Sequence, residues 1–232
     1  MVNFPWTVHQ ENVLIVGLQG SGKTTQAVKI VQKIPHTPRI IVSPINRQSW
    51  MECGEPIDSL DQLGRGAYLW TGANDAATFD KICTIIMDQI PNCVFIVDDI
   101  QEYATKYTLP RPLNTLIQSG RNRGICSIWL SPSPNLISNY ILQSAQHIFA
   151  FRMNMESQIE WIERNYFGPD AYILLPPERR RKKGSIEFEG ILPRHAYLYR
   201  YYMDDFNQLY VPEGAAPPPP APEQAPAPEG SE

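Results

Sequence analysis

Residues 17–25 match the phosphate-loop pattern G-x-x-x-x-G-K-[ST], and this match constrains the fold of the chain more than any other feature. The apolar run at residues 13–16 is typical of a buried strand, and apolar residues recur at helical spacing over residues 23–34. In a strand, glycine loop and helix of this order, backbone N–H groups and the helix N-terminus point at phosphate oxygens. The sequence therefore predicts a nucleotide site. A glycine-rich turn that binds nothing is the less favoured interpretation.

The polar groups of this loop have expected roles with ATP and Mg²⁺ as cofactors. Lys23 would reach the β and γ phosphates, and Thr24 would supply a hydroxyl to the Mg²⁺ ion that bridges them. The expected nucleotide-binding residues are Gly17, Gly20, Ser21, Gly22, Lys23, Thr24 and Thr25.

A second apolar run, at residues 93–97, ends in the carboxylates of Asp98 and Asp99. Such a run is typical of a buried parallel strand, and acids at its carboxyl end lie in the crevice where open α/β sheets bind ligands. We expect Asp98 to hold the magnesium shell and Asp99 to orient and deprotonate the attacking water. Glu102 is a second candidate base. The alternative is that both aspartates merely cap the following helix.

Apolar segments and helical segments alternate along the chain. Strands are expected at residues 13–16, 38–43, 67–70, 93–97, 125–130 and 147–151, and helices at 23–34, 75–90, 113–124, 134–145 and 155–167. This order predicts an α/β fold with a mostly parallel sheet covered by helices on both faces. Residues 46–66 are expected to form a loop. Ser131, at the end of the 125–130 strand, is placed to sense the γ phosphate.

The length of 232 residues suits one sizeable domain, which we place at residues 1–211. Its core is expected at about residues 12–167, and a strand-rich extension at about 168–211. Residues 212–232 are acidic and rich in proline, so we expect a disordered tail. No apolar run approaches the roughly twenty residues of a membrane span, and the N-terminus lacks signal-peptide features. The expected protein is soluble and intracellular.

The net charge of −4 arises in the tail, which carries four of the 24 acidic residues and none of the 20 basic ones. The remainder is formally neutral and lacks the overall basic charge that marks many nucleic-acid-binding proteins. Any contact with DNA must therefore be local. The densest basic run consists of Arg179, Arg180, Arg181, Lys182 and Lys183.

We expect this run to contact DNA phosphates, because phosphate contacts need concentrated positive charge. It lies before residues 185–191 and 196–202, which alternate as strands do. A solvated turn, or a contact with an acidic protein surface, agrees with the sequence equally well.

The order of these parts resembles the additional-strand P-loop NTPases of the FtsK-HerA superfamily, and within it the genome-packaging NTPases of turreted icosahedral archaeal viruses. The resemblance rests on residues 17–25, on residues 94–99 and on the block at 119–131, and it covers about residues 12–151. The family usually has Asp-Glu at the positions of Asp98-Asp99, and a Gln within residues 131–134.

This resemblance implies an ATP-hydrolysing motor that translocates double-stranded DNA into a viral capsid. It implies a homo-oligomer, a hexameric ring, in which Arg121 or Arg123 reaches the nucleotide of the neighbouring subunit. It also implies a protein of the host cytoplasm, associated with the virion or capsid vertex and not integral to a membrane. The tail would then bind capsid or internal-membrane proteins.

Two other functions stay open at this point. A small-molecule or nucleotide kinase, or a P-loop switch protein, would need a lid and an acceptor pocket, for which residues 46–66 offer the length. However, kinases and GTPases usually place the strand with the magnesium acid beside the phosphate-loop strand, whereas the strand after Asp98-Asp99 suggests an inserted strand. A cellular or conjugative DNA-pumping ATPase is the second alternative, and the sequence does not separate it from a packaging motor.

Overall fold

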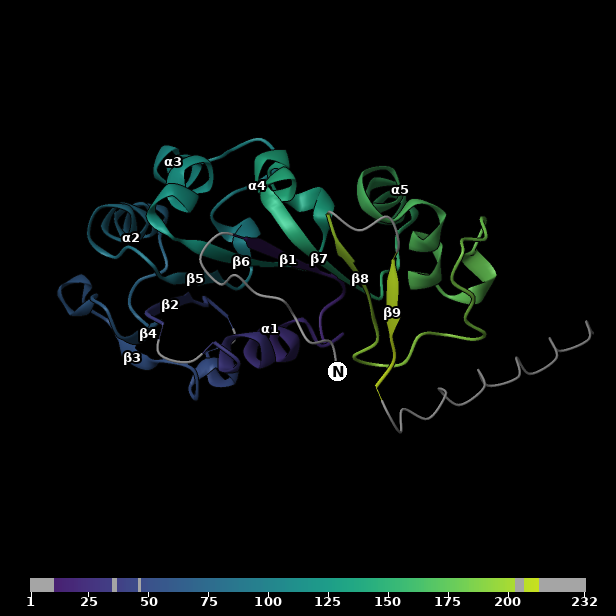
Figure 1. Ribbon diagram of the computed structural model, residues 1–232, viewed down its shortest axis with the longest axis horizontal. Coiled ribbons are helices and arrows are strands. Elements are labelled where there is room, and N and C mark those ends of the chain that lie inside the picture. The colour runs from purple at the N-terminus through teal and green to yellow at the C-terminus, as the bar shows by residue number, and fades with distance from the viewer. Residues whose placement is uncertain (1–10, 35–36, 46, 203–206, 213–232) are drawn as a thin grey trace, which may run out of the picture.

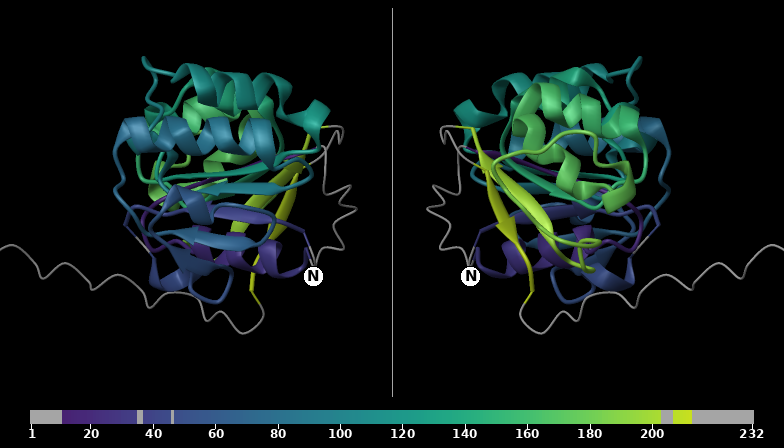
Figure 2. Two further views of the ribbon diagram at one scale, coloured as in Figure 1. Left: turned by 90° about the vertical axis from the view of Figure 1, so that its left-hand side faces the viewer. Right: turned by 90° about the vertical axis from the view of Figure 1, so that its right-hand side faces the viewer.

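The computed structural model describes residues 11–34, 37–45, 47–202 and 207–212. Within these residues the strands form a nine-stranded sheet with helices on both faces (Figures 1 and 2). The strands are β1 (Asn12–Val16), β2 (Arg39–Val42), β3 (Glu55–Ile57), β4 (Ala67–Trp70), β5 (Val94–Val97), β6 (Cys126–Ser131), β7 (Ala145–Phe151), β8 (Tyr197–Tyr201) and β9 (Gln208–Tyr210). The α-helices are α1 (Lys23–Gln32), α2 (Ala76–Gln89), α3 (Arg111–Ser119), α4 (Asn139–Ser144) and α5 (Glu156–Ile162). The expected tail lies outside the described residues from residue 213 onward.

One strand separates the phosphate-loop strand from the strand that ends in the aspartates. The sheet order is β3-β4-β2-β5-β6-β1-β7-β8-β9, and neighbouring strands from β3 to β7 are parallel. β1 pairs with β6 on one side and with β7 on the other, so β6 lies between β1 and β5. This is the additional-strand arrangement, and the predicted fold class is confirmed.

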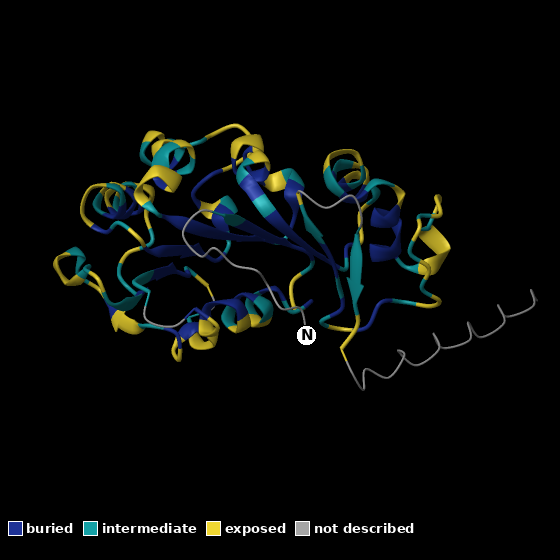
Figure 3. Cartoon of the chain, in the orientation of Figure 1, coloured by how far each residue is buried: buried dark blue, intermediate teal, exposed yellow. Residues whose placement is uncertain are grey.

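Successive residues of the central strands point to opposite faces of the sheet, and both faces are covered. Leu14 and Val16 of β1 pack with apolar residues of α2, α3, α4 and α5, whereas Val13 and Ile15 pack with those of α1. None of these β1 side chains is exposed. Burial on both faces explains why the strands are continuous apolar runs in the sequence. Figure 3 shows the same pattern, with buried strands beneath helices whose outer faces are exposed.

The segment 46–66 was expected to be a loop, but its described residues 47–66 contain regular structure at the edge of the sheet. It contains the edge strand β3 and the short 3-10 helices η1 (Gln48–Trp50) and η2 (Leu60–Gln62). β3 holds Pro56 in the middle of its sequence, which an edge strand tolerates because one side of it makes no ladder bonds. This segment is therefore part of the sheet's edge layer.

The C-terminal extension returns to the same sheet. After α5 the chain forms a π-helical turn (Glu163–Phe167) and a largely buried 3-10 helix (Gly168–Leu174). β8 then pairs antiparallel with β7, and β9 pairs antiparallel with β8. The strand expected at residues 196–202 is confirmed as β8, and β9 was not expected. Among the described residues, no helix has the length and apolarity to cross a membrane.

The strand expected at residues 185–191 is wrong. Asp170 accepts a hydrogen bond from the backbone N–H of Ile186 at 3.0 Å, and Arg180 donates to the backbone carbonyl of Phe188 at 2.6 Å. The side chains of the buried Asp170 and the partly buried Arg180 thus occupy backbone N–H and C=O groups that would pair with a neighbouring strand if this segment were a strand. Alternating apolar residues were not sufficient to make a strand where these polar anchors compete.

Candidate active site

The phosphate loop connects β1 to α1 at the carboxyl edge of the parallel strands. Gly22, the N-cap of α1, has a φ of 111°, a backbone region that glycine enters without steric strain. The start of the loop is bound to both neighbouring strands, because Gly17 N donates to Ser131 O at 3.3 Å and Leu18 N donates to Arg152 O at 3.0 Å. The loop is therefore fixed to the ends of β6 and β7.

Lys23 is folded back onto the loop that carries it. Its Nζ donates to Gly17 O at 2.8 Å and to Leu18 O at 3.1 Å, and the residue is 8% exposed. Burial lowers the pKa of Lys23, while the negative charges of Asp99 and Asp98 oppose this shift. The ammonium group thus lies within the field of both carboxylates, which is where a phosphate-binding lysine is needed.

The structure brings the loop and the end of β5 together at Thr24 and Asp98. The Thr24 hydroxyl donates to Asp98 Oδ2 at 3.3 Å, and Asp98 is 3% exposed. The same oxygen accepts a hydrogen bond from the indole N–H of Trp50 at 2.9 Å. Burial is the main cause of a raised pKa at Asp98, and the hydrogen bonds from Trp50 and Thr24 act against it.

These two residues fit a magnesium ion. Mg²⁺ prefers oxygen ligands and is commonly held by one or two carboxylates, with water and substrate phosphates completing its shell. The Asp98 carboxylate and the Thr24 hydroxyl beside it supply two oxygen ligands of that kind. Thr25, the next residue of the pattern, is exposed on α1, whereas Ser21 is buried.

Asp99 lies at a sharp turn directly after β5. Its φ and ψ of 60° and 51° place it in the left-handed region, which residues other than glycine enter at a cost, aspartate and asparagine more readily than most. Gln101 Nε2 donates to Asp99 Oδ1 at 3.2 Å and thereby orients the carboxylate. Glu102 lies on the short helix η3 (Ile100–Glu102) and is exposed. Of the two candidate bases, Asp99 is the one whose charge acts on Lys23.

Ser131 has a scaffolding contact in place of the expected free hydroxyl. The residue is fully buried, and its Oγ donates to Ser133 O at 2.9 Å and accepts from Ser133 N at 3.3 Å. Its backbone oxygen binds Gly17 N. The hydroxyl is engaged by its own turn, so the geometry does not support the predicted role of sensing a γ phosphate.

Arg121 and Arg123 lie at the opposite edge of the sheet from the phosphate loop. Both are exposed on the short helix η4 (Gly120–Arg123), which precedes β6, whereas the loop follows the other end of the parallel strand β1. The length of β6 separates these arginines from the phosphate loop, and six residues of a strand span about 20 Å. Neither arginine lies near the nucleotide site of its own subunit.

The basic run at residues 179–183 is bound largely to its own subunit. Arg180 donates to the backbone carbonyls of Leu175, Ile173, Phe188 and Gly190, at 3.0, 3.2, 2.6 and 2.7 Å respectively. Since a guanidinium has five N–H donors, little of its capacity is left for a phosphate. The structure therefore gives Arg180 a structural position, which does not fit the expected DNA contact.

The other members of the run are closer to solvent. Arg181 pairs with Glu156 at 3.0 Å and Lys182 with Glu163 at 2.6 Å, and the two basic side chains are 69% and 54% exposed. Arg179 Nη1 donates to a backbone carbonyl, and Lys183 is exposed. Exposed ion pairs of this kind are weak, so a polyanion could compete for these side chains.

The sequence did not predict that residues 194–195 of the C-terminal extension pack against the phosphate loop. Arg194 Nε donates to Gly20 O at 3.1 Å, and His195 N donates to Ser21 O at 3.0 Å. His195 has a φ of 68°, and a Cβ added to Gly22 would overlap its ring. Burial is the main cause of a lowered pKa at His195. No local pattern signals this contact, because the partners are more than 170 positions apart.

Trp50 is the second residue that the sequence analysis missed. It comes from η1, inside the segment expected to be a loop, and it is fully buried between that segment and α1. The signal that the sequence offered was a large aromatic residue in a segment without periodic apolar spacing.

No protein-family model matches the chain, and no curated protein sequence matches it. Solved structures do match. The genome packaging NTPase B204 of Sulfolobus turreted icosahedral virus 2, in complex with sulfate, has a TM-score of 0.69 at 14% identity, over 88% of this chain and 97% of that one. Its complex with ATP-gammaS has a TM-score of 0.67 at 15% identity, over 88% and 98% of the chains.

A more distant match is the N-terminal domain of zonular occludens toxin from Neisseria meningitidis, with a TM-score of 0.51 at 14% identity, over 88% and 94% of the chains. At these identities the similarity concerns the fold. It agrees with the family resemblance drawn from the sequence, and the fold is that of the P-loop NTPases.

Proposed function

We propose that this chain is an ATP-hydrolysing motor that translocates double-stranded DNA into a viral capsid. The observation that carries the proposal is the approach of the Thr24 hydroxyl to within 3.3 Å of Asp98, in a sheet where β6 separates β5 from β1. This juxtaposition brings a phosphate loop, a lysine and a carboxylate suited to Mg²⁺ to one edge of an additional-strand sheet.

Within this site each side chain has a distinct task. The loop N–H groups and Lys23 would bind the β and γ phosphates, which requires Lys23 Nζ to leave the carbonyls of Gly17 and Leu18. Thr24 and Asp98 would hold Mg²⁺, which when bound neutralises phosphate charge. Asp99 would accept a proton from the attacking water, and its fixed orientation by Gln101 suits that task.

The choice of substrate and assembly rests on similarity to B204, which is named a genome packaging NTPase and is covered almost completely by this chain. By this analogy the partners are duplex DNA and further copies of the chain, in a hexameric ring within the host cytoplasm or at a capsid vertex. An arginine at the far edge of the sheet, Arg121 or Arg123, would then act on the neighbour's nucleotide. The tail would bind capsid or internal-membrane proteins.

The test is an ATPase assay with and without duplex DNA, run beside a measurement of particle size with and without nucleotide. We expect magnesium-dependent hydrolysis that duplex DNA stimulates, and a ring-sized particle in the presence of nucleotide. Lys23→Ala should abolish hydrolysis, because it removes the charge that holds the β and γ phosphates. An ATP hydrolysis rate that duplex DNA does not change, at any DNA length or salt concentration tested, would contradict the proposed motor function.

The kinase alternative is weakened by the fold. The segment 46–66, which had to provide a lid, forms an edge strand and packs its Trp50 into the interior. A DNA-pumping ATPase of cellular or conjugative origin has the same site, and transfer of DNA into purified empty capsids separates the two motors.

A further inference from the structure

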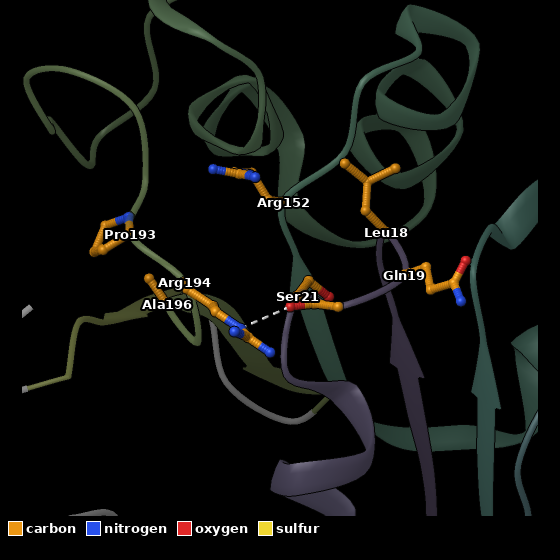
Figure 4. Close-up of a pocket in the computed structure, with 8 residues that line it drawn as sticks. Leu18, Gln19, Ser21, Arg152, Pro193, Arg194 and Ala196 are labelled. Carbon is orange, nitrogen blue, oxygen red and sulfur yellow. Dashed lines mark hydrogen bonds between the residues drawn. The ribbon is translucent and has the colours of Figure 1, made fainter. Parts of the chain in front are cut away.

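A pocket of about 350 Å³ lies beside the phosphate loop, on the side of β7 and β8 (Figure 4). Its walls come from the loop, from Arg152 after β7 and from the segment before β8. The lining residues are Leu18, Gln19, Gly20, Ser21, Arg152, Pro193, Arg194 and Ala196. This volume lies within the range of small-molecule pockets, which begins at about 300 Å³.

Within the described structure, the pocket is lined by one buried hydroxyl that lacks a partner and by two guanidinium groups. The Ser21 hydroxyl is buried and has no hydrogen-bond partner among the described residues. Arg152 and Arg194 form no ion pair with a carboxylate in the described part of the chain. Each donates one hydrogen bond to a backbone carbonyl, Arg152 Nη1 to Leu192 O at 3.5 Å and Arg194 Nε to Gly20 O at 3.1 Å. Figure 4 shows both guanidinium groups and Ser21 around the same space. Buried polar groups are normally satisfied, so the unpaired Ser21 hydroxyl indicates a ligand, and the two guanidinium groups beside it still have N–H donors to offer.

The sheet order decides which part of a nucleotide would lie there. The carboxylates of Asp98 and Asp99 follow β5, which lies on one side of β1, and the pocket adjoins β7 on the other side. A nucleotide whose terminal phosphate faces the carboxylates must extend its other end away from β5, across the loop. Its ribose and base therefore point towards Arg152 and Arg194.

The chemistry of the lining agrees with this direction. Leu18, Pro193 and Ala196 offer apolar surface, and guanidinium groups stack on aromatic planes such as nucleobases. The hydroxyl of Ser21 is suited to a sugar hydroxyl or a phosphate oxygen. The wall is also fixed, since Arg194 and His195 bind the carbonyls of Gly20 and Ser21.

We propose that this pocket binds the nucleoside part of the nucleotide, with Arg152 and Arg194 packing against the base and ribose. The proposal rests on the nucleotide-binding function proposed above. It adds that the C-terminal extension is part of the nucleotide site, and that ATP binds by two separable regions of this chain.

Arg152→Gln is the sharpest variant, because the contact of Arg152 with the loop is made by its backbone oxygen and survives the change. We expect its affinity for ATP to fall about tenfold to a hundredfold, and its affinity for inorganic tripolyphosphate to stay unchanged. Arg194→Gln should weaken the binding of both ligands, and that of ATP more, because Arg194 also donates a hydrogen bond to Gly20 of the phosphate loop. Arg164→Gln, at an exposed arginine of the π-helical turn, is the matched control and should change neither.

A second experiment needs no variant. The full chain is irradiated with 8-azido-ATP, and the labelled peptide is identified by mass spectrometry. Label on residues 193–196 or at Arg152 supports the proposal. Equal loss of ATP and tripolyphosphate in Arg152→Gln, or label confined to other segments, overturns it while leaving nucleotide binding intact. A wild-type chain that binds neither ATP nor tripolyphosphate would overturn the proposed function as well.

Discussion

The indole Nε1 of Trp50 lies 2.9 Å from Oδ2 of Asp98, the oxygen that the Thr24 hydroxyl also reaches at 3.3 Å. Two donors therefore converge on one oxygen of a buried carboxylate and fix its rotation. The contact joins the segment after β2 to the end of β5, so the edge layer of the sheet takes part in shaping the candidate magnesium site.

Trp50→Phe should weaken magnesium binding. The ring is largely kept but the N–H is lost, and a hydrogen bond to a charged group contributes about 1.5–3 kcal/mol. We expect the Mg²⁺ concentration for half-maximal ATPase activity to rise about tenfold, and the tryptophan fluorescence change on adding Mg²⁺ and nucleotide to shrink. Trp161→Phe, at a tryptophan of α5 that packs on Tyr166, is the control. If the magnesium dependence of Trp50→Phe equals that of the wild type, the hydrogen bond from Trp50 to Asp98 does not affect magnesium binding and the prediction is wrong.

Asp98→Asn should raise the melting temperature of the nucleotide-free protein at pH 7. Burial raises the pKa of Asp98, so its contribution to stability is greatest while it is protonated and is lost as the pH rises through the folded-state pKa. Asparagine stays neutral and still accepts from Trp50. In a chain of this size each kcal/mol gained corresponds to about 2–4 °C. Thermal unfolding from pH 4 to pH 8 should show that the melting temperature of Asp98→Asn exceeds that of the wild type by an amount that grows with pH. A melting temperature of Asp98→Asn below that of the wild type at pH 7 would contradict this prediction.

The pairing of Thr24 with Asp98 was predictable from the sequence although 74 positions separate them. Parallel strands bring their carboxyl ends to one edge, so two motifs that each follow an apolar run must meet there. Trp50 and Arg194 were not predictable in this way. Their places depend on how irregular segments fold back on the loop, and such segments carry no periodic pattern.

The strand expected at residues 185–191 failed for a related reason. Its side chains alternate, but the pattern does not reveal that Asp170 and Arg180 bind its backbone first. The bonds of Arg180 to backbone carbonyls also explain why one member of the basic run has a structural position in place of the expected DNA contact. The sequence shows how many basic residues lie close together at 179–183, but tertiary contacts decide which of them are free to bind DNA.

Asp99→Asn should stop turnover and leave ATP binding intact. The amide cannot accept a proton from water, and loss of a general base lowers rates by about 10² to 10⁴. Glu102→Gln is the matched control, because Glu102 is exposed on η3 and should be dispensable. Single-turnover hydrolysis and equilibrium binding separate the two effects. The opposite result, with Glu102→Gln inactive and Asp99→Asn active, would transfer the role to Glu102.

Mixed rings should reveal an arginine that acts between subunits. Arg121 and Arg123 lie beyond reach of their own nucleotide site, so Arg121→Ala or Arg123→Ala should lower ATPase activity only through the neighbour. Such an arginine contributes a factor of about 10³ to 10⁵ in rate. Mixing an inactive arginine variant with Lys23→Ala should partly restore activity, measured across several ratios. Rescue absent at all ratios, with both variants folded, would count against this role.

The final prediction separates the structural from the available charges of the basic run. Arg180→Ala should destabilise the protein by roughly 2–4 kcal/mol, because four backbone carbonyls, two of them of the buried residues Ile173 and Leu175, lose their donor. Arg181→Ala removes an exposed ion pair and should cost less than about 1 kcal/mol.

For DNA the order should reverse. Replacing Arg181, Lys182 and Lys183 together by Ala should weaken duplex binding across all sequences and flatten its dependence on salt, since each phosphate contact releases counterions. Chemical denaturation and binding titrations at several salt concentrations measure the two properties on the same variants. If Arg180→Ala binds DNA more weakly but is as stable as the wild type, Arg180 contacts DNA and its bonds to backbone carbonyls do not stabilise the fold. If the triple variant binds DNA as the wild type does, the run is a turn that packs on α5, and the motor must hold DNA elsewhere.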